Sequence, residues 1–380
     1  MNIIMFHSVG NAQSDWYRKW LSTDIDQFEA LCQYLKKKKY HTILLDDWYH
    51  LQNFPQKITG KEILLTFDDG FLDNWVFAYP ILKKYGLKGT IFINPEFVDP
   101  NIKIRMTIED VWNKKCTKEE LTTLGYANWA EIKKMDTDKV LDVQSHSMSH
   151  NFYFNSNKVV DIFEGQQEYD WMAWNSHPEL KPFSLSENQL NLIPEGTPIF
   201  SNYRALGLRR YFPDEELTKK SIELYSKTKD KSKCIEYIEN NIPNFPGRFE
   251  TDSEMDARFR YELFESKLIL EKQLDKKVNF LCWPGGGYNE LSINISKEAG
   301  YIASTISSRE VNVDLDNSSS YKRIQRFGIG SFLTTKKQRH FVKSNQFLIE
   351  TFLGRSGNNF YRNILRYRKL KFLIKDFLTK

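Results

Sequence analysis

The stretch Ile63-Leu64-Leu65-Thr66-Phe67-Asp68-Asp69-Gly70 is a run of apolar, β-favouring residues that ends in two carboxylates and a glycine. Such a run is typical of a buried strand. Open and barrel-shaped α/β folds place their chemistry at the C-terminal ends of strands. Because successive strand residues point to opposite faces, we expect Asp68 and Asp69 to do different work, one binding a cation and the other facing a substrate. Taken alone, a plain Asp-Asp-Gly turn is the more frequent outcome.

Strands and helices alternate on both sides of this stretch, which predicts a largely parallel α/β sheet or barrel. Strands are predicted at residues 2–6, 41–45, 62–67, 89–93, 140–144, 278–282, 301–306 and 323–329. Helices are predicted at 24–38, 74–85, 128–135, 258–275 and 290–299, with a Ser-rich loop at 317–320. Residues 151–257 interrupt the alternation, and we expect them to form an insertion with small elements of its own, including a helix near 215–240.

The composition is that of a globular protein with a large core. The 380 residues, with 27 Phe, 19 Tyr and 9 Trp, suffice for one large α/β domain with an insertion or for two domains. The four cysteines are far apart and form no Cys-x-x-Cys pair, which favours a reducing compartment over disulfides or a cysteine zinc site. The chain shows no basic leader and no run of ~18 apolar residues, so we expect a cytoplasmic location.

The positive charge is concentrated near the C-terminus. Residues 340–380 hold nine Lys or Arg and two acids, a net charge of +7, so the other 339 residues carry −2 of the total of +5. This distribution predicts an anionic partner for the tail and gives no indication of nucleic-acid binding by the body.

Residues 358–380 of this basic tail are predicted to form an amphipathic helix. Its apolar face comprises Tyr367, Leu370, Leu373, Ile374, Phe377 and Leu378, and the surrounding basic residues are Arg362, Arg366, Lys369, Lys371 and Lys375. One interpretation is peripheral contact with the inner face of a membrane, where the substrate would be a lipid-linked glycan. The other is a helix docked on the body with a solvated basic face.

A second motif, His146-x-x-x-His150, follows the strand predicted at 140–144. Two imidazoles four residues apart can bind one cation if the intervening residues form a turn, and Asp69 would add a carboxylate. Two His and one Asp make a site for Zn²⁺ or a neighbouring divalent ion that also binds water and substrate oxygen. The alternative is a surface or capping pair, since one such pair carries little information by itself.

These two motifs together resemble the polysaccharide deacetylase family, which is the NodB-homology domain of carbohydrate esterase family 4. The resemblance rests on Thr66-Phe-Asp-Asp-Gly70, His146-Ser147-x-x-His150, Tyr79–Ile93, Phe280-x-x-Trp283-Pro-Gly-Gly-x-Tyr288 and Glu298-Ala-Gly-Tyr301, which occur in family order. It covers about residues 1–150 and 258–330. It implies a distorted (β/α) barrel over residues 1–335, interrupted by the insertion at about 151–257 and followed by the basic amphipathic tail at 340–380.

The resemblance also implies roles for individual residues. Asp68 matches the family's general base, and Asp69, His146 and His150 match its metal ligands. The family's late histidine, the general acid, has no counterpart near 323–330. The segment Ile3–Val9 resembles the opening strand of circularly permuted members, so His7 is our candidate for that role; the alternative is a capped histidine at a strand end.

Two further sites are predicted from the resemblance. The family's arginine that orients the base is missing before Pro284, and Arg326 is a candidate substitute, although it could equally be a surface strand residue. Trp283, Pro284, Gly285 and Tyr288 could form one wall of a sugar-binding groove; alternatively, Trp283 belongs to the core. His340, the only late histidine, is expected in a solvated basic segment.

The implied activity is metal-dependent deacetylation of an N-acetylated sugar in a glycan or glycan precursor, with Asp68 as general base and a metal-bound water as nucleophile. Zn²⁺ is the expected ion, with Co²⁺ or Ni²⁺ as alternatives. A carbohydrate O-acetyl esterase with the same site and a non-catalytic glycan-binding protein are the competing interpretations. The insertion follows the metal histidines directly and is expected to overhang the site, unless it is a structural extension or a dimer contact.

Overall fold

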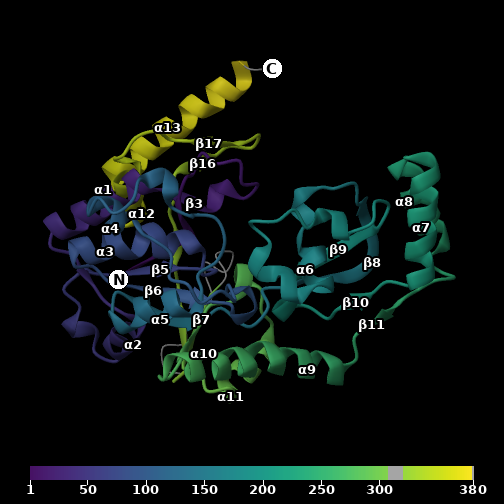
Figure 1. The fold of residues 1–380 in the computed structure, drawn as a ribbon, viewed down its shortest axis with the longest axis horizontal. Coiled ribbons are helices and arrows are strands. Elements are labelled where there is room, and N and C mark those ends of the chain that lie inside the picture. Colours follow the sequence, from purple (N-terminus) through teal and green to yellow (C-terminus); the bar gives the residue numbers. More distant parts are fainter. Residues whose placement is uncertain (307–319, 379–380) are drawn as a thin grey trace. The chain divides into compact units, whose positions relative to one another are not determined.

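The computed structural model describes residues 1–306 and 320–378, so most of the predicted loop at 317–320 lies outside the described residues. Figure 1 shows the fold. The chain divides into two compact units. The first comprises Met1–Ile93, Val98–Gln144 and the described residues from 320 onward, and the second comprises Asn94–Phe97 and residues 145–306.

A parallel sheet forms the centre of the first unit, with the strand order β7-β6-β5-β1-β15 and with β4 beside β5. These strands are β1 (Asn2–Phe6), β4 (His41–Thr42), β5 (Glu62–Phe67), β6 (Gly89–Ile93), β7 (Leu141–Ser145) and β15 (Phe327–Gly328), and β14 (Lys322–Ile324) precedes β15. All residues of β5 from Ile63 to Phe67 are buried, as expected for a strand covered on both faces. The predicted strand before the two acids is therefore confirmed, and it lies inside the sheet.

The helices of this unit begin and end at recognisable signals. They are α1 (Ile25–Lys37), α2 (Leu45–Gln52), α3 (Tyr79–Tyr85), α4 (Ile108–Trp112), α5 (Trp129–Thr137), α12 (Phe347–Arg355) and α13 (Asn359–Leu378). The unit also contains two small two-stranded sheets, which pair β2 (Ser8–Gly10) with β3 (Ser22–Asp24) and β16 (Phe332–Thr334) with β17 (Arg339–Phe341). Asp24 caps α1 by accepting the backbone N–H groups of Asp26 and Gln27. Gly86 ends α3 in the left-handed conformation, with φ of 63°.

Two predictions for this unit were wrong in detail. The strand predicted at 41–45 ends at Thr42, because Leu45 begins α2, where the Asp47 carboxylate accepts the Leu44 N–H at 3.2 Å. The strand predicted at 323–329 is divided into β14 and β15, and Arg326 lies in the interruption.

In the second unit, β12 (Phe280–Leu281) pairs in parallel with β13 (Ala303–Thr305) and, through Leu281, with Ser145 of β7. The insertion contains a long antiparallel pair, β8 (Phe152–Ile162) with β9 (Pro198–Arg204), and a core in which Ile162 and Phe200 are fully buried. Its other elements are α6 (Trp171–Ser176), α7 (Glu215–Thr228), α8 (Lys231–Asn241), β10 (Tyr211–Phe212) and β11 (Arg248–Phe249). Residues 151–257 therefore contain helices and strands of their own, as predicted.

The helical predictions for this unit also needed correction. The single helix near 215–240 is two helices, because Lys229 adopts the left-handed conformation, with φ of 50°, at the end of α7. The long helix at 258–275 consists of α9 (Asp252–Arg260), a π-helical turn (Tyr261–Glu265) and α10 (Ser266–Leu274). The helix α11 (Glu290–Glu298) agrees with its prediction. Among the described residues, no helix is both long enough and apolar enough to cross a membrane.

Candidate active site

The two acids lie at the point where β5 ends. Asp68 is 3% exposed, and its backbone N–H still donates to the carbonyl of Phe6 on β1 at 3.0 Å. Asp69 already leaves the extended conformation, with φ of 74°, and Gly70 follows with φ of 70°. Asp tolerates this left-handed region better than most residues, although it costs roughly 1 kcal/mol. The two carboxylates therefore differ in orientation, because the chain turns sharply at Asp69 and because successive strand residues alternate between faces.

Arg326 forms a buried ion pair with Asp68 within the first unit. Its two terminal guanidinium nitrogens donate to the two carboxylate oxygens at 2.7 and 2.9 Å, and one of them also donates to Thr66 Oγ1 at 3.1 Å. The side chains of Arg326 and Asp68 are 7% and 4% exposed. A buried, two-point pair of this kind fixes the position and rotation of the carboxylate. Arg326 is thus a buried partner of Asp68 and not a surface strand residue.

His7 follows β1 at the position that corresponds to Asp68. The parallel register pairs Phe6 with Phe67, so the next residues along the two strands are His7 and Asp68. His7 is half-buried, and its backbone carbonyl accepts a hydrogen bond from Asn74 Nδ2 at 2.8 Å. The predicted acid and the predicted base therefore follow two adjacent strands of the sheet.

His340, which we expected in a solvated basic segment, is instead buried. It is 8% exposed, and its ring stacks on Phe372 of α13 with centroids 4.3 Å apart. Its Nε2 lies 2.9 Å from a carboxylate oxygen of Asp376. The expectation of a solvated segment was wrong because the C-terminal helix covers this residue.

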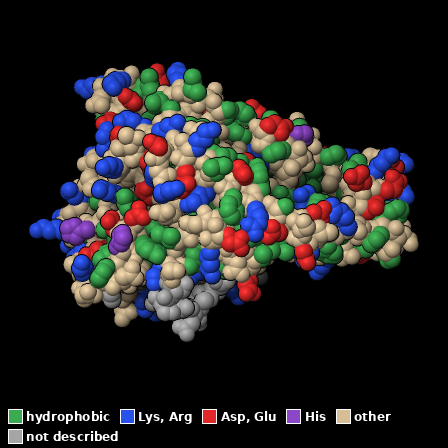
Figure 2. All heavy atoms as spheres, turned by 90° about the horizontal axis from the view of Figure 1, so that it is seen from below, with side chains coloured by type: hydrophobic (Ala, Val, Ile, Leu, Met, Phe, Trp, Pro, Cys, Tyr) green, Lys and Arg blue, Asp and Glu red, His purple; other side chains and the backbone are tan. Residues whose placement is uncertain are grey.

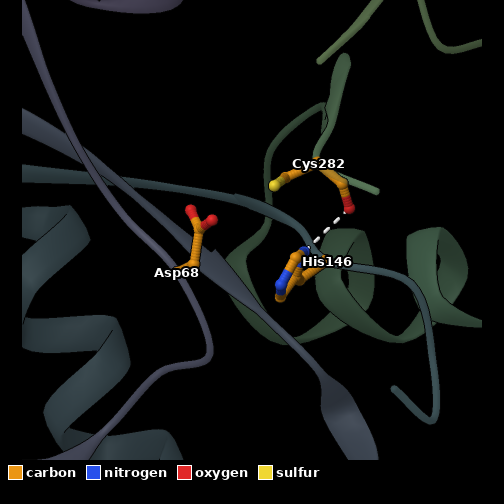
Figure 3. A group of neighbouring side chains, drawn as sticks. All are labelled: Asp68, His146 and Cys282. Atoms are coloured by element: carbon orange, nitrogen blue, oxygen red, sulfur yellow. Dashed lines mark hydrogen bonds between the residues drawn. The ribbon is translucent and has the colours of Figure 1, made fainter. Parts of the chain in front are cut away.

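The two histidines of the second motif lie in the second unit. His146 is 2% exposed, and its Nδ1 donates to the backbone carbonyl of Cys282 at 2.8 Å, as Figure 3 shows. Because a carbonyl can only accept, this bond places the proton on Nδ1 and assigns Nε2 as the atom able to bind a metal. The rings of His146 and His150 lie 5.2 Å apart between centroids, so the structure brings the two histidines together.

The loop that carries these histidines is strained and held in place. Ser147 and His150 have φ of 62° and 50°, a conformation that non-glycine residues adopt only when their surroundings enforce it. Glu262, in the π-helical turn, accepts the backbone N–H groups of Met148 and Ser149 at 3.1 and 3.0 Å and also bonds the Ser149 hydroxyl. A buried carboxylate therefore fixes the backbone between the two imidazoles.

Lys181 of the insertion holds the same loop from another side. It is fully buried and donates to the carbonyl of Ser149 at 2.9 Å, to Asn151 Oδ1 at 2.7 Å and to Glu96. Burial lowers the pKa of this lysine, and the carboxylate of Glu96 opposes that effect. Sequence reasoning missed Cys282, Glu262 and Lys181 as supports of the histidines. The sequence carries no signal for them, because the carbonyl contact of Cys282 and the burial of Glu262 and Lys181 arise only in the fold.

The glycine-rich loop after β12, which is the predicted sugar-binding wall, is only partly exposed. Trp283 is 1% exposed, and its backbone N–H donates to Thr305 Oγ1 at 3.1 Å, so its ring belongs to the core. Pro284 is also buried, whereas Gly285 is exposed and Tyr288 is half-buried. Of the four predicted substrate-binding residues, Gly285 and Tyr288 are those with surface to offer a ligand.

The insertion packs directly on this glycine-rich loop. A Cβ added to Gly287 would lie 2.1 Å from Arg204 Cβ, and one added to Gly285 would lie 2.0 Å from Arg204 Nε. The guanidinium of Arg204 also lies over the ring of Phe152, 4.1 Å from its centroid. The glycines are therefore required because β9 of the insertion approaches the loop closely.

The donor chemistry of the predicted metal ligands fits a divalent ion. Asp69 offers a carboxylate oxygen, and His146 and His150 each offer a ring nitrogen. The carbonyl bond to His146 Nδ1 is the kind of outer contact that orients a metal-binding imidazole. Two imidazoles and one carboxylate suit Zn²⁺ and neighbouring ions.

Comparison with known proteins agrees with these observations. Residues 56–179, about a third of the chain, match the family model described as polysaccharide deacetylase. The protein YxkH of Bacillus subtilis (strain 168), provisionally assigned as a polysaccharide deacetylase, is 37% identical over 91 residues, which make up 24% of this chain and 30% of that protein. The chain thus spans less than a third of that relative's length.

The solved structure of a de-N-acetylase from Aggregatibacter actinomycetemcomitans superposes with a TM-score of 0.52 at 15% identity, covering 87% of this chain and 94% of that one. At this identity the likeness concerns the fold, and it confirms the predicted distorted (β/α) barrel class. The segment matched by the family model contains Asp68, Asp69, His146 and His150. Over residues 56–179 the chain is therefore similar to polysaccharide deacetylases.

Proposed function

We propose that this chain hydrolyses the acetamide group of an N-acetylated sugar, in a glycan or glycan precursor, and releases acetate. The observation that carries the proposal is the buried pair of Asp68 and Arg326 at the C-terminal end of a central strand. A carboxylate held at both oxygens, inside the segment that matches a deacetylase family, has the fixed position that a general base needs.

We further propose Asp69, His146 and His150 as ligands of one divalent ion, most simply Zn²⁺, with Co²⁺ or Ni²⁺ as alternatives. The donor set supports this, as does the carbonyl contact that orients His146. When bound, such an ion would polarise the acetyl carbonyl and acidify the attacking water.

The residues of the chain would then divide the proton transfers. Asp68 accepts a proton from the water whose oxygen bonds to the acetyl carbon. Arg326 keeps both oxygens of Asp68 in place and so positions the base. His7 donates a proton to the sugar nitrogen as the C–N bond breaks, so that a neutral amine leaves with acetate as the second product. The pairing of Phe6 with Phe67 supports this assignment, because His7 and Asp68 are the next residues along the two adjacent strands.

We propose that the substrate is an acetylated carbohydrate, lipid-linked in the case where the reaction takes place on the cytoplasmic side of a membrane. Gly285 and Tyr288 are the candidates to contact it, while Trp283 and Pro284 would support them from below. An O-acetyl esterase would use the same base and metal and remains the second candidate. A non-catalytic glycan-binding protein would have no need for a carboxylate held as Asp68 is.

Acetate release from a panel of N-acetylated and O-acetylated sugars tests the proposal. We expect acetate from the wild type and none from Asp68→Asn, while Asp46→Asn, which changes an exposed acid on α2, retains activity. Acetate only from the O-acetylated members would establish the esterase. A folded wild type that binds glycans and releases no acetate across the panel would refute a catalytic function.

A further inference from the structure

One side of the C-terminal helix α13 is docked on the first unit. Asp376 is 3% exposed, and it accepts hydrogen bonds from Thr335 Oγ1 at 2.6 Å and from Gln338 Nε2 at 2.8 Å. Arg368 bonds both carboxylate oxygens of Glu350 on α12 at 2.7 and 2.9 Å. These contacts hold the helix in one rotation about its axis.

The opposite side of α13 is apolar and exposed. At 3.6 residues per turn, the docked positions Tyr361, Leu365, Arg368, Phe372 and Asp376 form one stripe along the helix. The predicted apolar residues lie on the other side and are exposed by 41–74%: Tyr367, Leu370, Leu373, Ile374, Phe377 and Leu378. The helix is thus docked on one face, and it presents a second, apolar face outward.

Basic residues border this apolar stripe on both sides. Arg362, Arg366 and Lys369 lie along one edge and Lys371 and Lys375 along the other, and all five are exposed. The only acid of the helix, Asp376, is turned inward and paired. In contrast, the face of the molecule drawn in Figure 2 shows basic and acidic side chains interspersed. Among the described residues of α13, the outward side carries apolar and positive groups and no carboxylate.

We propose that the outward face of α13 lies on a membrane surface that contains anionic phospholipid. Apolar side chains would enter the boundary between headgroups and acyl chains, and the flanking Lys and Arg would bind lipid phosphates, as in other interfacial helices. Charge complementarity favours this occupant over a second copy of the chain, because two such helices face to face would bring their basic edges together. The helix is about 30 Å long, too small a contact for a stable dimer to overcome that repulsion.

Vesicle co-sedimentation tests this inference. We expect the chain of residues 1–380 to bind vesicles of phosphatidylcholine with about one-third phosphatidylserine at least about tenfold more strongly than phosphatidylcholine alone. It should lose most of this binding at high salt. The triple variant Leu370→Ser, Ile374→Ser, Phe377→Ser and the triple variant Arg366→Glu, Lys369→Glu, Lys371→Glu should each weaken binding by a similar factor.

A matched control reverses three exposed lysines elsewhere, Lys133, Lys219 and Lys227, and should bind like the wild type. Equal binding to both vesicle types, or wild-type binding by the apolar variant, would overturn the inference. A wild-type dimer that becomes a monomer in the apolar variant, without vesicle binding, would identify a second copy as the occupant and would also overturn it. Deleting residues 358–380 is a blunter test, because it also removes Asp376 from the interior.

Discussion

Replacing Arg326 by Ala should destabilise the first unit strongly. The change leaves the carboxylate of Asp68 buried, with 4% of its side chain exposed, after removal of two hydrogen bonds of 2.7 and 2.9 Å and one positive charge. Breaking a buried ion pair by removing one partner typically costs about 3–5 kcal/mol, mostly because the remaining charge stays buried without that partner. We expect a loss in this range in the free energy of unfolding, measured by urea titration.

A double-mutant cycle separates the pair from general packing. The Asp68→Asn variant has no carboxylate charge at this position. In that variant, Arg326→Ala should therefore lower the free energy of unfolding by at least about 2 kcal/mol less than it does in the wild type. Arg326→Lys keeps the charge but cannot bond both oxygens, so its stability should lie between those of the wild type and Arg326→Ala.

The catalytic part of the prediction uses Arg105 as a control. Arg105 also forms ion pairs in the first unit that are partly buried, with Asp99 at 2.9 Å and Glu131 at 2.6 Å. Arg105→Ala should therefore reduce stability while the folded fraction keeps its kcat for acetate release, whereas Arg326→Lys should lower kcat at full folding. A cycle with coupling below about 0.5 kcal/mol, or unchanged kcat in Arg326→Lys, would refute the assignment of Arg326 as the residue that positions the base.

Three further predictions concern other residues of the first and second units. Glu262→Gln should weaken zinc binding by roughly 10–100-fold in a competition titration, because the backbone between the histidines loses its carboxylate anchor; unchanged affinity would contradict this. His7→Gln should slow acetate release from an N-acetylated sugar far more than from an activated aryl acetate, whose leaving group needs no proton; equal slowing would exclude His7 as the acid. Burial raises the pKa of Asp73 to about 7. Between about pH 4 and pH 7 the folded state therefore binds a proton that the unfolded state lacks, and wild-type stability should fall as pH rises through this window by up to about 4 kcal/mol. Asp73→Asn should lack this slope in thermal melts, and parallel curves for the two proteins would show the assignment to be wrong.

The sequence predicted the elements of the sheet that carry local signals. The apolar run before Asp68 and the spacing of His146 and His150 identified two strand ends, because strand burial and turns depend on residues that are neighbours in the sequence. The sequence offers Arg326 only as a candidate, since its contact with Asp68 joins positions 258 residues apart. Arg326 lies between β14 and β15, where the sequence predicts one continuous strand.

Other features could not be predicted because they depend on contacts distant in the sequence. Glu262 is an ordinary helical acid in the sequence, and only the π-helical turn and its bonds to Met148 and Ser149 reveal its role. The strand predicted at 41–45 is shorter than expected because Asp47 caps the helix that begins at Leu45. In the tail, the helical period identified the apolar face, but whether that face packs inward depends on partners such as Thr335, which only the fold supplies.

The central claim is that the two adjacent acids have separate tasks, with Asp68 as base and Asp69 as metal ligand. The most direct test is the zinc content of purified Asp68→Asn and Asp69→Asn, measured beside their acetate release. We expect Asp68→Asn to keep the zinc content of the wild type and to release no acetate, and Asp69→Asn to lose both. If Asp68→Asn lost its zinc while Asp69→Asn retained it, the division of roles between the two carboxylates would be wrong.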